Sequence, residues 1–593
     1  MQTKENHLIV ENGQTKWRII ISRSAAPAEI RAAQELQRFL LESTGVCLAI
    51  EDDQTPVEPF EILVGPGNHA TALFPLADPE SGQEALTGER FTIRTANDSL
   101  LILGGSPRGT LYGVYSFLEK YLGCRWFTPT VDKIPRRSRL ELPDINIVGQ
   151  PSLDYRDLYC FDVFDQDWLV RNKINGHTQK LDPEHGGNIS YAHFVHTFDQ
   201  LVPAGEYFAE HPEYFSEVDG HRLSEKTQLC LTNPEVAVIA IKQVRQWLKD
   251  EPDARIVSVS QNDCYNPCQC ESCRRLDQEE GSHSGTLIYF VNQIARAVAA
   301  EFPDVLIDTL AYQYTRKPPR HIKPEPNVVV RLCSIECCFS HPLEECREIS
   351  FPFNLSGRPD TIFADDLAGW SKISKQLYIW DYVTNFNHYL MPFPNLPVFQ
   401  PNIQFFIKNQ VKGIFEQGNG QSAGGDFSEL KAYVLAKLLW DERCDVDAVI
   451  NDFLAGCYSH AAVWIRRYLD LFWQETARSK VHAGIYDSPD KNRLSAAFLE
   501  QASDCFDRAE QAADDPEILK RVKKLRLPLL YVQLFALPDE QPDRQRRQIS
   551  FMNDLQSLGV QRISEAMDMD VCRRQLDQGL SFRQIEKRRM ESL

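Results

Sequence analysis

The feature that most constrains this fold is a regular alternation of strand-like and helical segments between about residues 152 and 440. Short runs rich in β-branched and aromatic residues predict buried strands, and the amphipathic stretches between them predict helices. The alternation predicts eight strands, which begin near residues 153, 191, 229, 256, 306, 328, 377 and 413. Eight parallel strands in such a repeat predict a (β/α)8 TIM barrel in an α/β protein.

Patterns on either side of this barrel predict two further domains. Upstream, a strand at Trp17–Ser22, a helix from Pro27 and a hairpin around Asn97–Asp98 predict an N-terminal α/β sandwich domain. After about residue 444 the chain carries almost only amphipathic helical patterns, which predict an all-helical domain and a surface for a homodimer. The predicted boundaries are therefore 1–147, 148–442 and 443–593.

Composition excludes some classes of partner. The 593 residues carry a formal net charge of −19, which argues against nucleic acid or an anionic membrane as the main partner. No segment approaches the roughly 18 uninterrupted apolar residues that a membrane span needs. The first residues lack the apolar stretch of a signal peptide, so we expect a cytoplasmic protein with mostly reduced thiols.

Polar and aromatic side chains follow the predicted barrel strands, where the active sites of this fold lie. The run Ile256–Ser260 ends in Gln261, Asn262 and Asp263, and the second strand-like stretch, near Tyr191 to Phe198, carries His193 and His196. The other strand ends carry Arg156, Asp157, Tyr312, Tyr314, Glu336, Trp380, Asp381, Tyr382 and Glu416. Aromatic faces stack on a pyranose ring while carboxylates and arginine bind its hydroxyls, so the pattern predicts a site for a small oligosaccharide. A turn or a structural ion pair is the alternative for each residue alone.

The pair Asn262–Asp263 suits one particular glycosidase chemistry. A substrate with a 2-acetamido group supplies its own nucleophile, so the enzyme needs one group to hold the acetamide and an acid beside it. Asn262 would hold the acetamide and Asp263 would protonate the leaving oxygen. Glu336, Asp381 and Glu416 are alternative carriers of the acid role.

A cysteine-rich loop follows this pair directly. Cys268, Cys270 and Cys273 have the C-x-C-x2-C spacing of thiolate zinc ligands, with Cys264 or a distant residue as the fourth. The sequence therefore predicts a structural zinc ion, with small buried thiols that shape the loop as the alternative. The Cys337–Cys338 pair is interpreted as buried apolar side chains. No cofactor is expected for catalysis itself.

Several of these motifs resemble known families. The stretches Gly104–Gly113 and Gly123–Phe127 are similar to the domain that precedes the barrel in β-hexosaminidases and α-glucuronidases. The motifs Ser260–Asp263, Trp380–Thr384 and Phe415–Gly418 resemble a large bacterial family of unknown function. Some members of that family are β-N-acetylgalactosaminidases or β-N-acetylhexosaminidases.

The resemblance implies roles for individual residues. Arg156 and Glu416 would hold sugar hydroxyls, and Trp380 would line the acetamide pocket. The best-known hexosaminidases have an adjacent Asp-Glu pair where this chain has Asn262–Asp263. The acid, Asp263, therefore has a shorter side chain than the usual Glu. The group that would stabilise the acetamide, Asn262, is an uncharged amide in place of a carboxylate.

Together these observations predict a retaining glycosidase that acts by substrate-assisted catalysis. Its substrate would be a terminal β-linked N-acetylhexosamine, with N-acetylgalactosamine (GalNAc) preferred. One alternative is an α-glucuronidase-like inverting hydrolase that uses carboxylates such as Asp381 and Glu416. The other is a carbohydrate-binding barrel without catalysis, which binding without turnover would support.

Overall fold

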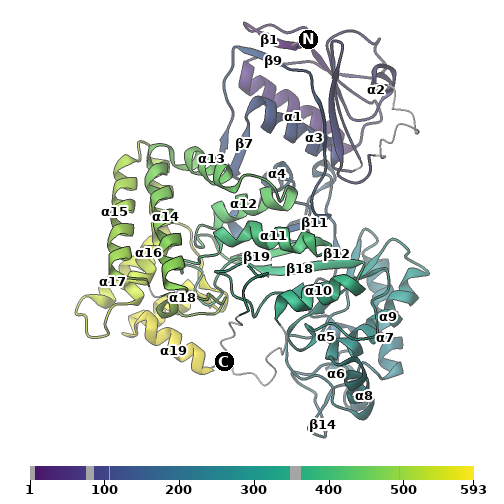
Figure 1. Ribbon diagram of the computed structural model, residues 1–593, viewed down its shortest axis with the longest axis vertical. Helices are drawn as coiled ribbons and strands as arrows, with labels where there is room; N and C mark the ends of the chain where they lie inside the picture. Colours follow the sequence, from purple (N-terminus) through teal and green to yellow (C-terminus); the bar gives the residue numbers. More distant parts are fainter. Residues whose placement is uncertain (1–6, 75–85, 106, 348–361, 493, 593) are drawn as a thin grey trace.

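The structure is a computed structural model that describes residues 7–74, 86–105, 107–347, 362–492 and 494–592. Residues 1–6, on which the prediction about a signal peptide depends, and Ser106 lie outside the described residues. An N-terminal α/β unit, a central curled parallel sheet and a group of C-terminal helices follow one another along the chain (Figure 1).

The N-terminal unit is built on a six-stranded mixed sheet in the order β10-β5-β6-β4-β2-β3. The predicted strands, helix and hairpin are confirmed, and Asn97 takes the positive φ of 52° that the tight hairpin turn requires. Helix α1 begins with Pro27 in its first turn and ends at Gly45, whose φ of 75° closes it. The elements are β1 (His7–Glu11), β2 (Arg18–Ile21), α1 (Pro27–Thr44), β3 (Ile50–Asp52), β4 (Glu61–Val64), α2 (Asn68–Leu73), β5 (Phe91–Ala96), β6 (Ser99–Gly104), α3 (Gly109–Phe117), β7 (Arg125–Thr128), β8 (Val131–Lys133), β9 (Arg139–Leu142) and β10 (Asn146–Gly149).

The central sheet has seven parallel strands in the order β11-β19-β18-β17-β16-β15-β12. Seven of the eight predicted strands are confirmed, but the predicted strand at 229–232 is wrong because β12 pairs directly with β15. Leu229 makes only an isolated antiparallel bridge with Phe215. The strands are β11 (Tyr155–Tyr159), β12 (Tyr191–Ala192), β15 (Ile256–Ser258), β16 (Leu306–Ala311), β17 (Val328–Cys333), β18 (Gln376–Tyr382) and β19 (Val411–Gln417).

The segment at 228–230 makes other contacts that explain the missing strand. The Gln228 amide donates to the carbonyls of Asn262 and Cys264, both at 2.8 Å. The Cys230 thiol lies within a cluster of cysteines described below. Within the described residues, no strand pairing joins β11 and β12, so the curled sheet is open at that edge.

Side chains alternate strictly between the two faces of the curled sheet. Tyr155, Tyr378 and Phe415 belong to one cluster inside the curl, and Ile379 and Ile414 belong to the core between the sheet and its helices. Two neighbouring residues of a strand therefore cannot both face the interior. The helices, and two short strands in the connections, are α4 (Gln166–Arg171), α5 (Phe198–Leu201), α6 (Ala204–Tyr207), β13 (Glu217–Val218), β14 (His221–Arg222), α7 (Pro234–Asp250), α8 (Glu271–Glu280), α9 (His283–Ala299), α10 (Phe363–Ile373), α11 (Phe399–Lys408) and α12 (Ser428–Trp440).

The C-terminal region is mainly helical and lies beside the central sheet (Figure 1). The all-helical prediction is wrong in one respect, because a short hairpin, β20 (Arg562–Ser564) and β21 (Met567–Asp568), lies among the helices. Backbone bonds of 2.9 Å from Tyr389 to Ile563 and from Glu565 to Phe386 attach this hairpin to the loop after β18. The helices are α13 (Val446–Tyr458), α14 (Ala462–Ser479), α15 (Ala496–Ala512), α16 (Pro516–Phe535), α17 (Arg544–Ser557), α18 (Met569–Asp577) and α19 (Phe582–Ser592). None of the described helices combines the length and apolar content that a bilayer crossing requires.

Candidate active site

A cavity of about 240 Å³, which we call the strand-end pocket, opens at the carboxyl ends of the parallel strands. This is where active sites of parallel α/β barrels form. The cavity is smaller than the pockets of drug-sized ligands, about 300 Å³ and above, so its size suits one sugar ring. Its lining residues are Val195, His196, Asp263, Leu310, Tyr312, Cys333, Ile335, Trp380, Tyr382, Phe386, Gln417, Tyr486 and Glu565.

Five predicted site residues meet in this pocket: His196, Asp263, Tyr312, Trp380 and Tyr382. Asp263 is exposed at the rim, and its Oδ1 accepts a hydrogen bond of 3.1 Å from the hydroxyl of Tyr312. A carboxylate held by a neighbouring strand end has a fixed direction toward the pocket. Asp263 is therefore positioned for proton transfer to or from a bound group.

The aromatic wall of the pocket is held rigidly. Nε1 of Trp380 donates to Oε1 of Gln417 at 2.8 Å, and its ring packs edge-on against Phe415 at 4.8 Å between centroids. Tyr382 lies nearly parallel to Trp380, with an interplanar angle of 26° and a centroid distance of 6.3 Å. The wall thus offers flat apolar faces of the kind that stack on sugar rings.

The two histidines predicted near the second strand take different positions. Nδ1 of His196 lies 2.8 Å from the carbonyl of Gln261 and must donate to it, so the neutral ring carries its lone pair on Nε2. His196 also lines the pocket and has a positive φ of 54°. His193 instead stacks on Trp247 at 3.8 Å and lies outside the pocket.

Tyr486 and Glu565 line the pocket from the C-terminal region, where the sequence analysis predicted no site residue. Glu565 sits between β20 and β21, in the hairpin that interrupts the C-terminal helices. Burial, and after it the negative charge of Asp263, raise the pKa of Glu565. The pocket therefore contains two carboxyl groups, one from the strand ends and one from the C-terminal region.

Asn262 does not face the pocket, contrary to its predicted acetamide contact. Its Nδ2 donates to the carbonyl of Thr227 at 2.9 Å, and its Oδ1 accepts from the backbone N–H of Asp199 at 3.0 Å. Both ends of the amide are used in fixing the loop that carries Asp263. The turn-forming alternative describes Asn262 better than the catalytic one.

Asp381 and Glu416, predicted to bind sugar or to act as acids, also lie outside the pocket. Strand alternation explains this, because Trp380, Tyr382 and Gln417 occupy the pocket-facing positions next to them. Burial raises the pKa of Asp381 to about 6, and burial and then Asp381 raise the pKa of Glu416 well above its ordinary value.

Arg156, predicted to hold sugar hydroxyls, is fully buried. It lies on the outer face of the curled sheet, because its neighbours Tyr155 and Asp157 face the inside. It forms an ion pair with Glu89 of the N-terminal unit, and its Nε donates to the carbonyl of Lys173 at 2.8 Å. Its guanidinium also lies 5.3 Å from the ring of Trp440. Arg156 thus joins the N-terminal unit to the parallel sheet instead of binding a ligand.

Two further predicted carboxylates are occupied by structural partners. Asp157 accepts a hydrogen bond of 2.6 Å from the hydroxyl of Tyr155 inside the curled sheet, and burial raises its pKa. Glu336 is buried and pairs with Arg316 at 3.3 Å. Neither lines the strand-end pocket, so its lining gives no support to the sugar contacts predicted for both residues.

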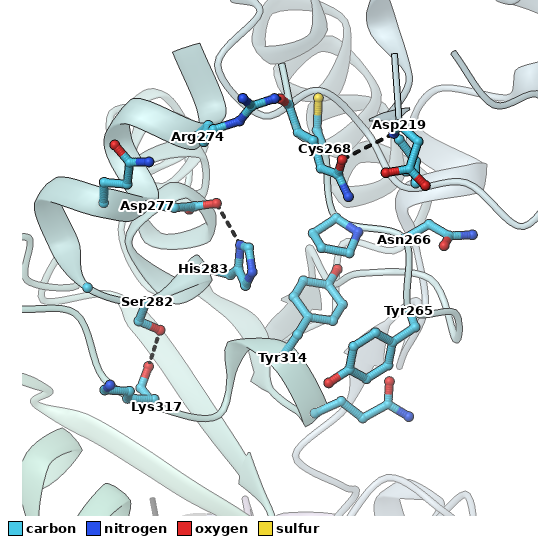
Figure 2. A pocket seen from close by; sticks show the side chains of 16 residues that line it. Asp219, Tyr265, Asn266, Cys268, Arg274, Asp277, Ser282, His283, Tyr314 and Lys317 are labelled. Carbon is cyan, nitrogen blue, oxygen red and sulfur yellow. Dashed lines mark hydrogen bonds and ion pairs between the residues drawn. The ribbon is translucent and has the colours of Figure 1, made fainter. Parts of the chain in front are cut away.

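The segment that follows Asp263 lines a second, larger groove of about 900 Å³ (Figure 2). Tyr265 and Tyr314 meet edge to face in it, with ring centroids 5.6 Å apart. Tyr314, predicted at the barrel mouth, therefore lies in the groove and not in the strand-end pocket. The loop that carries Asp263 continues directly to Tyr265, so one short segment contributes to both cavities.

The three predicted zinc ligands lie together with a fourth thiol, Cys230. The Cys230 sulfur is 3.7 Å from that of Cys270 and 3.9 Å from that of Cys273. Four sulfurs at about 2.3 Å from a tetrahedral zinc ion are separated by about 3.8 Å, so these positions fit the ion. Cys264, the nearer candidate for a fourth ligand, instead contacts Gln228 at 3.3 Å.

The chain combines a curled parallel sheet and a pocket at its strand ends with a preceding α/β unit that is similar to part of a glycosyl hydrolase. Residues 5–117 match the N-terminal domain of glycosyl hydrolase family 67. Residues 126–470, more than half of the chain, match the family described as domain of unknown function DUF4838, and the chain belongs to that family. No curated protein matches the sequence.

Solved structures of glycoside hydrolases resemble the chain at low sequence identity. A family GH115 4-O-methyl-α-glucuronidase, BtGH115A, has a TM-score of 0.53 and 11% identity, over 93% of this chain and 74% of that chain. CpGH84B has a TM-score of 0.45 and 10% identity, over 97% and 98% of the two chains. A GH138 enzyme that targets pectin rhamnogalacturonan II has a TM-score of 0.43 and 9% identity, over 95% and 78%. The likeness to the GH115 enzyme shows that the two proteins share a fold.

Proposed function

We propose that this protein is a glycosidase that removes a terminal β-linked N-acetylhexosamine from a small oligosaccharide. The single observation that carries the proposal is Asp263, held by the hydroxyl of Tyr312 at 3.1 Å in a sugar-sized aromatic pocket. The match of the N-terminal unit to a glycosyl hydrolase family supports the same class of activity. GalNAc is the preferred sugar, as the sequence resemblance implies.

Asp263 is the proposed general acid and base. Its exposed position at the rim places it beside the groove of Tyr265 and Tyr314, which would receive the leaving group. The acetamide oxygen attacks the anomeric carbon, the glycosidic bond breaks and Asp263 gives its proton to the leaving oxygen. Water then attacks the same carbon, the bond from this carbon to the acetamide oxygen breaks, and the water gives a proton back to Asp263, so that the configuration of the sugar is retained.

The acetamide needs partners other than Asn262, whose amide is already used in the loop. We assign it to the side of the pocket formed by Trp380, Tyr382 and Glu565. The raised pKa of Glu565 favours its protonated form, which can donate a hydrogen bond to a carbonyl oxygen. The flat rings of the wall suit the acetamide methyl group.

An α-glucuronidase activity is disfavoured by the charge of the pocket. A glucuronic acid carries its own carboxylate, which proteins usually bind with arginine or lysine. Among the described residues, none of the side chains that line the pocket is an arginine or a lysine, and two are carboxylic acids. Asp381 and Glu416, the carboxylates of that alternative, face away from the pocket.

The test measures the hydrolysis of aryl β-GalNAc, β-GlcNAc, β-glucuronide and β-glucoside by the wild type and by Asp263→Asn. Turnover confined to the acetamido sugars supports the proposal. Asp263→Asn should lose more than about 100-fold with a p-nitrophenyl leaving group and much less with 2,4-dinitrophenyl, which departs without a proton. Equal losses with both leaving groups in kcat/KM, which does not include the later water step, would remove Asp263 from the acid role. Binding of sugars without any turnover would favour the non-catalytic barrel.

The four thiols Cys230, Cys268, Cys270 and Cys273 are proposed to hold one structural zinc ion. The sulfur separations of 3.7 and 3.9 Å support this, as does the backbone N–H of Glu217 at 3.4 Å from the Cys268 sulfur. Such N–H groups stabilise thiolates around a bound metal. The paired variant Cys230→Ser with Cys270→Ser should lose one zinc ion per chain, and a wild-type protein without zinc would contradict the assignment.

A further inference from the structure

A second group of metal-ligating side chains lies far from the four thiols. Cys338, His341 and Cys346 belong to the segment after β17, and His482 follows α14 in the C-terminal region. One ligand atom from each of the four lies within 4.8 Å of the others. We propose that these residues bind one zinc ion, which joins the segment after β17 to the segment after α14.

The distances between ligand atoms fit tetrahedral coordination. With zinc about 2.3 Å from sulfur and about 2.0–2.1 Å from nitrogen, a tetrahedral site separates the two kinds of ligand by about 3.5 Å. The Cys338 sulfur is 3.3 Å from Nδ1 of His341, and the Cys346 sulfur is 3.5 Å from Nδ1 of His482. Two thiolates and two imidazoles are a donor set that zinc prefers.

The protein chain around the ligands is built to hold this arrangement. The backbone N–H of Phe339 donates to the carbonyl of Ala483 at 2.8 Å. The hydroxyl of Ser340 donates to the carbonyl of Val481, and the N–H of Ala483 donates to that hydroxyl at 3.2 Å. These bonds lie beside the ligands on both segments, so they bring the two halves of the site close enough for a metal ion to bridge them.

The ligands differ in exposure, which makes the site testable. Cys338 is buried, His341 and Cys346 are half-buried and His482 is exposed. Neither Cys338 nor Cys346 forms a disulfide, so both keep the thiol that zinc ligation needs. Replacing the exposed His482 should remove a ligand without creating a cavity in the core.

The site would act on the strand-end pocket through short segments. Ile335 lines the pocket three residues before Cys338, and Tyr486 lines it four residues after His482. Zinc would therefore hold Ile335 and Tyr486, on two sides of the pocket, at a fixed separation. Its removal should loosen substrate binding, although the metal test itself does not depend on the proposed activity.

The experiment measures zinc per chain by plasma mass spectrometry, on full-length protein purified without a metal-affinity tag. We expect two zinc ions in the wild type and one in the paired variant Cys346→Ser with His482→Ala. The matched control His460→Ala, an exposed histidine paired with Asp514, should keep two. One wild-type zinc ion that is lost in the paired variant but kept in Cys230→Ser with Cys270→Ser also supports the site.

Unchanged zinc content in the paired variant would overturn the proposal, and so would a wild type whose only zinc ion disappears with the four thiols. If the paired variant does not fold, His482→Ala alone gives the answer. A chelator should then remove one zinc ion at least ~10-fold faster than from the wild type, because three ligands hold the ion less tightly than four. Equal release rates would overturn the proposal.

Discussion

Asp381 on β18 lies directly opposite Glu416 on β19 in the register of the sheet, and neither carboxyl group faces the strand-end pocket. Glu416 points instead into a small cavity beside Lys431 and Leu435 of α12, and among the described residues its Oε2 has no hydrogen-bond partner. Both carboxyl groups are buried, and burial raises the pKa of each because it disfavours the charged form. The neighbouring Asp381 raises the pKa of Glu416 further. The pair is a source of pH-dependent instability.

The first prediction concerns stability and pH. The pKa of Asp381 is raised from 3.8 to about 6, so its contribution to stability is full below pH 3.8 and is lost as the pH rises through about 6. Glu416→Gln removes a neighbouring acid and should raise the free energy of unfolding at pH 8 by about 1–3 kcal/mol, with less effect at pH 4. Urea unfolding across this range measures the effect. Parallel curves for the two proteins would contradict it.

The second prediction uses two tyrosines from the same loop. Tyr312→Phe removes the hydroxyl that holds Asp263 and should lower kcat by about 10-fold, since a loosely oriented acid transfers protons less efficiently. Tyr314→Phe is the matched control: it keeps the ring in the groove that would receive the leaving group and removes only a hydroxyl, so it should lower kcat far less than Tyr312→Phe. Steady-state kinetics distinguish the two. Equal losses of kcat in the two variants would show that a general disturbance of the loop, and not the hydrogen bond to Asp263, causes the effect.

The third prediction concerns the aromatic wall. Trp380→Ala should raise KM by about 10–100-fold, because a stacking face worth about 1–3 kcal/mol is removed. Trp380→Phe keeps a ring but loses the hydrogen bond to Gln417, so its KM should rise less. Equal rises in KM for Phe and Ala would show that the hydrogen bond to Gln417, which both variants lose, and not the ring face, matters to the substrate.

The strand ends were predictable from sequence because buried strands have a clear composition and end at polar residues. Strand alternation also carries the direction of each side chain. Once Trp380 is assigned to the pocket, alternation assigns Tyr382 to it and excludes Asp381. The same argument selects Gln417 over Glu416 on the next strand.

Other parts of the site depend on contacts that no local pattern contains. Glu565 reaches the pocket from a hairpin some 300 residues after Asp263, and Cys230 joins thiols about 40 residues away. The segment of Cys230 also looked like a strand, because its apolar residues suit a strand and a buried loop equally. Contacts between distant parts of the chain determine the positions of Glu565 and of the Cys230 segment, and the periodicity of a local sequence contains no information about such contacts.

The last prediction separates a structural arginine from a sugar-binding one. Arg156→Met removes the buried partner of Glu89 at the junction of the N-terminal unit and the parallel sheet. Breaking a buried ion pair on one side typically costs about 3–5 kcal/mol, although Glu89 keeps Arg108 at 2.7 Å and this should limit the loss. Denaturant unfolding should show the loss, while KM of the folded enzyme stays within about twofold, because Arg156 does not touch the pocket.

Arg245→Met, which removes a partly exposed pair with Glu301, is the control and should cost less than about 1 kcal/mol. A large rise in KM with unchanged stability would return Arg156 to the role of a sugar ligand.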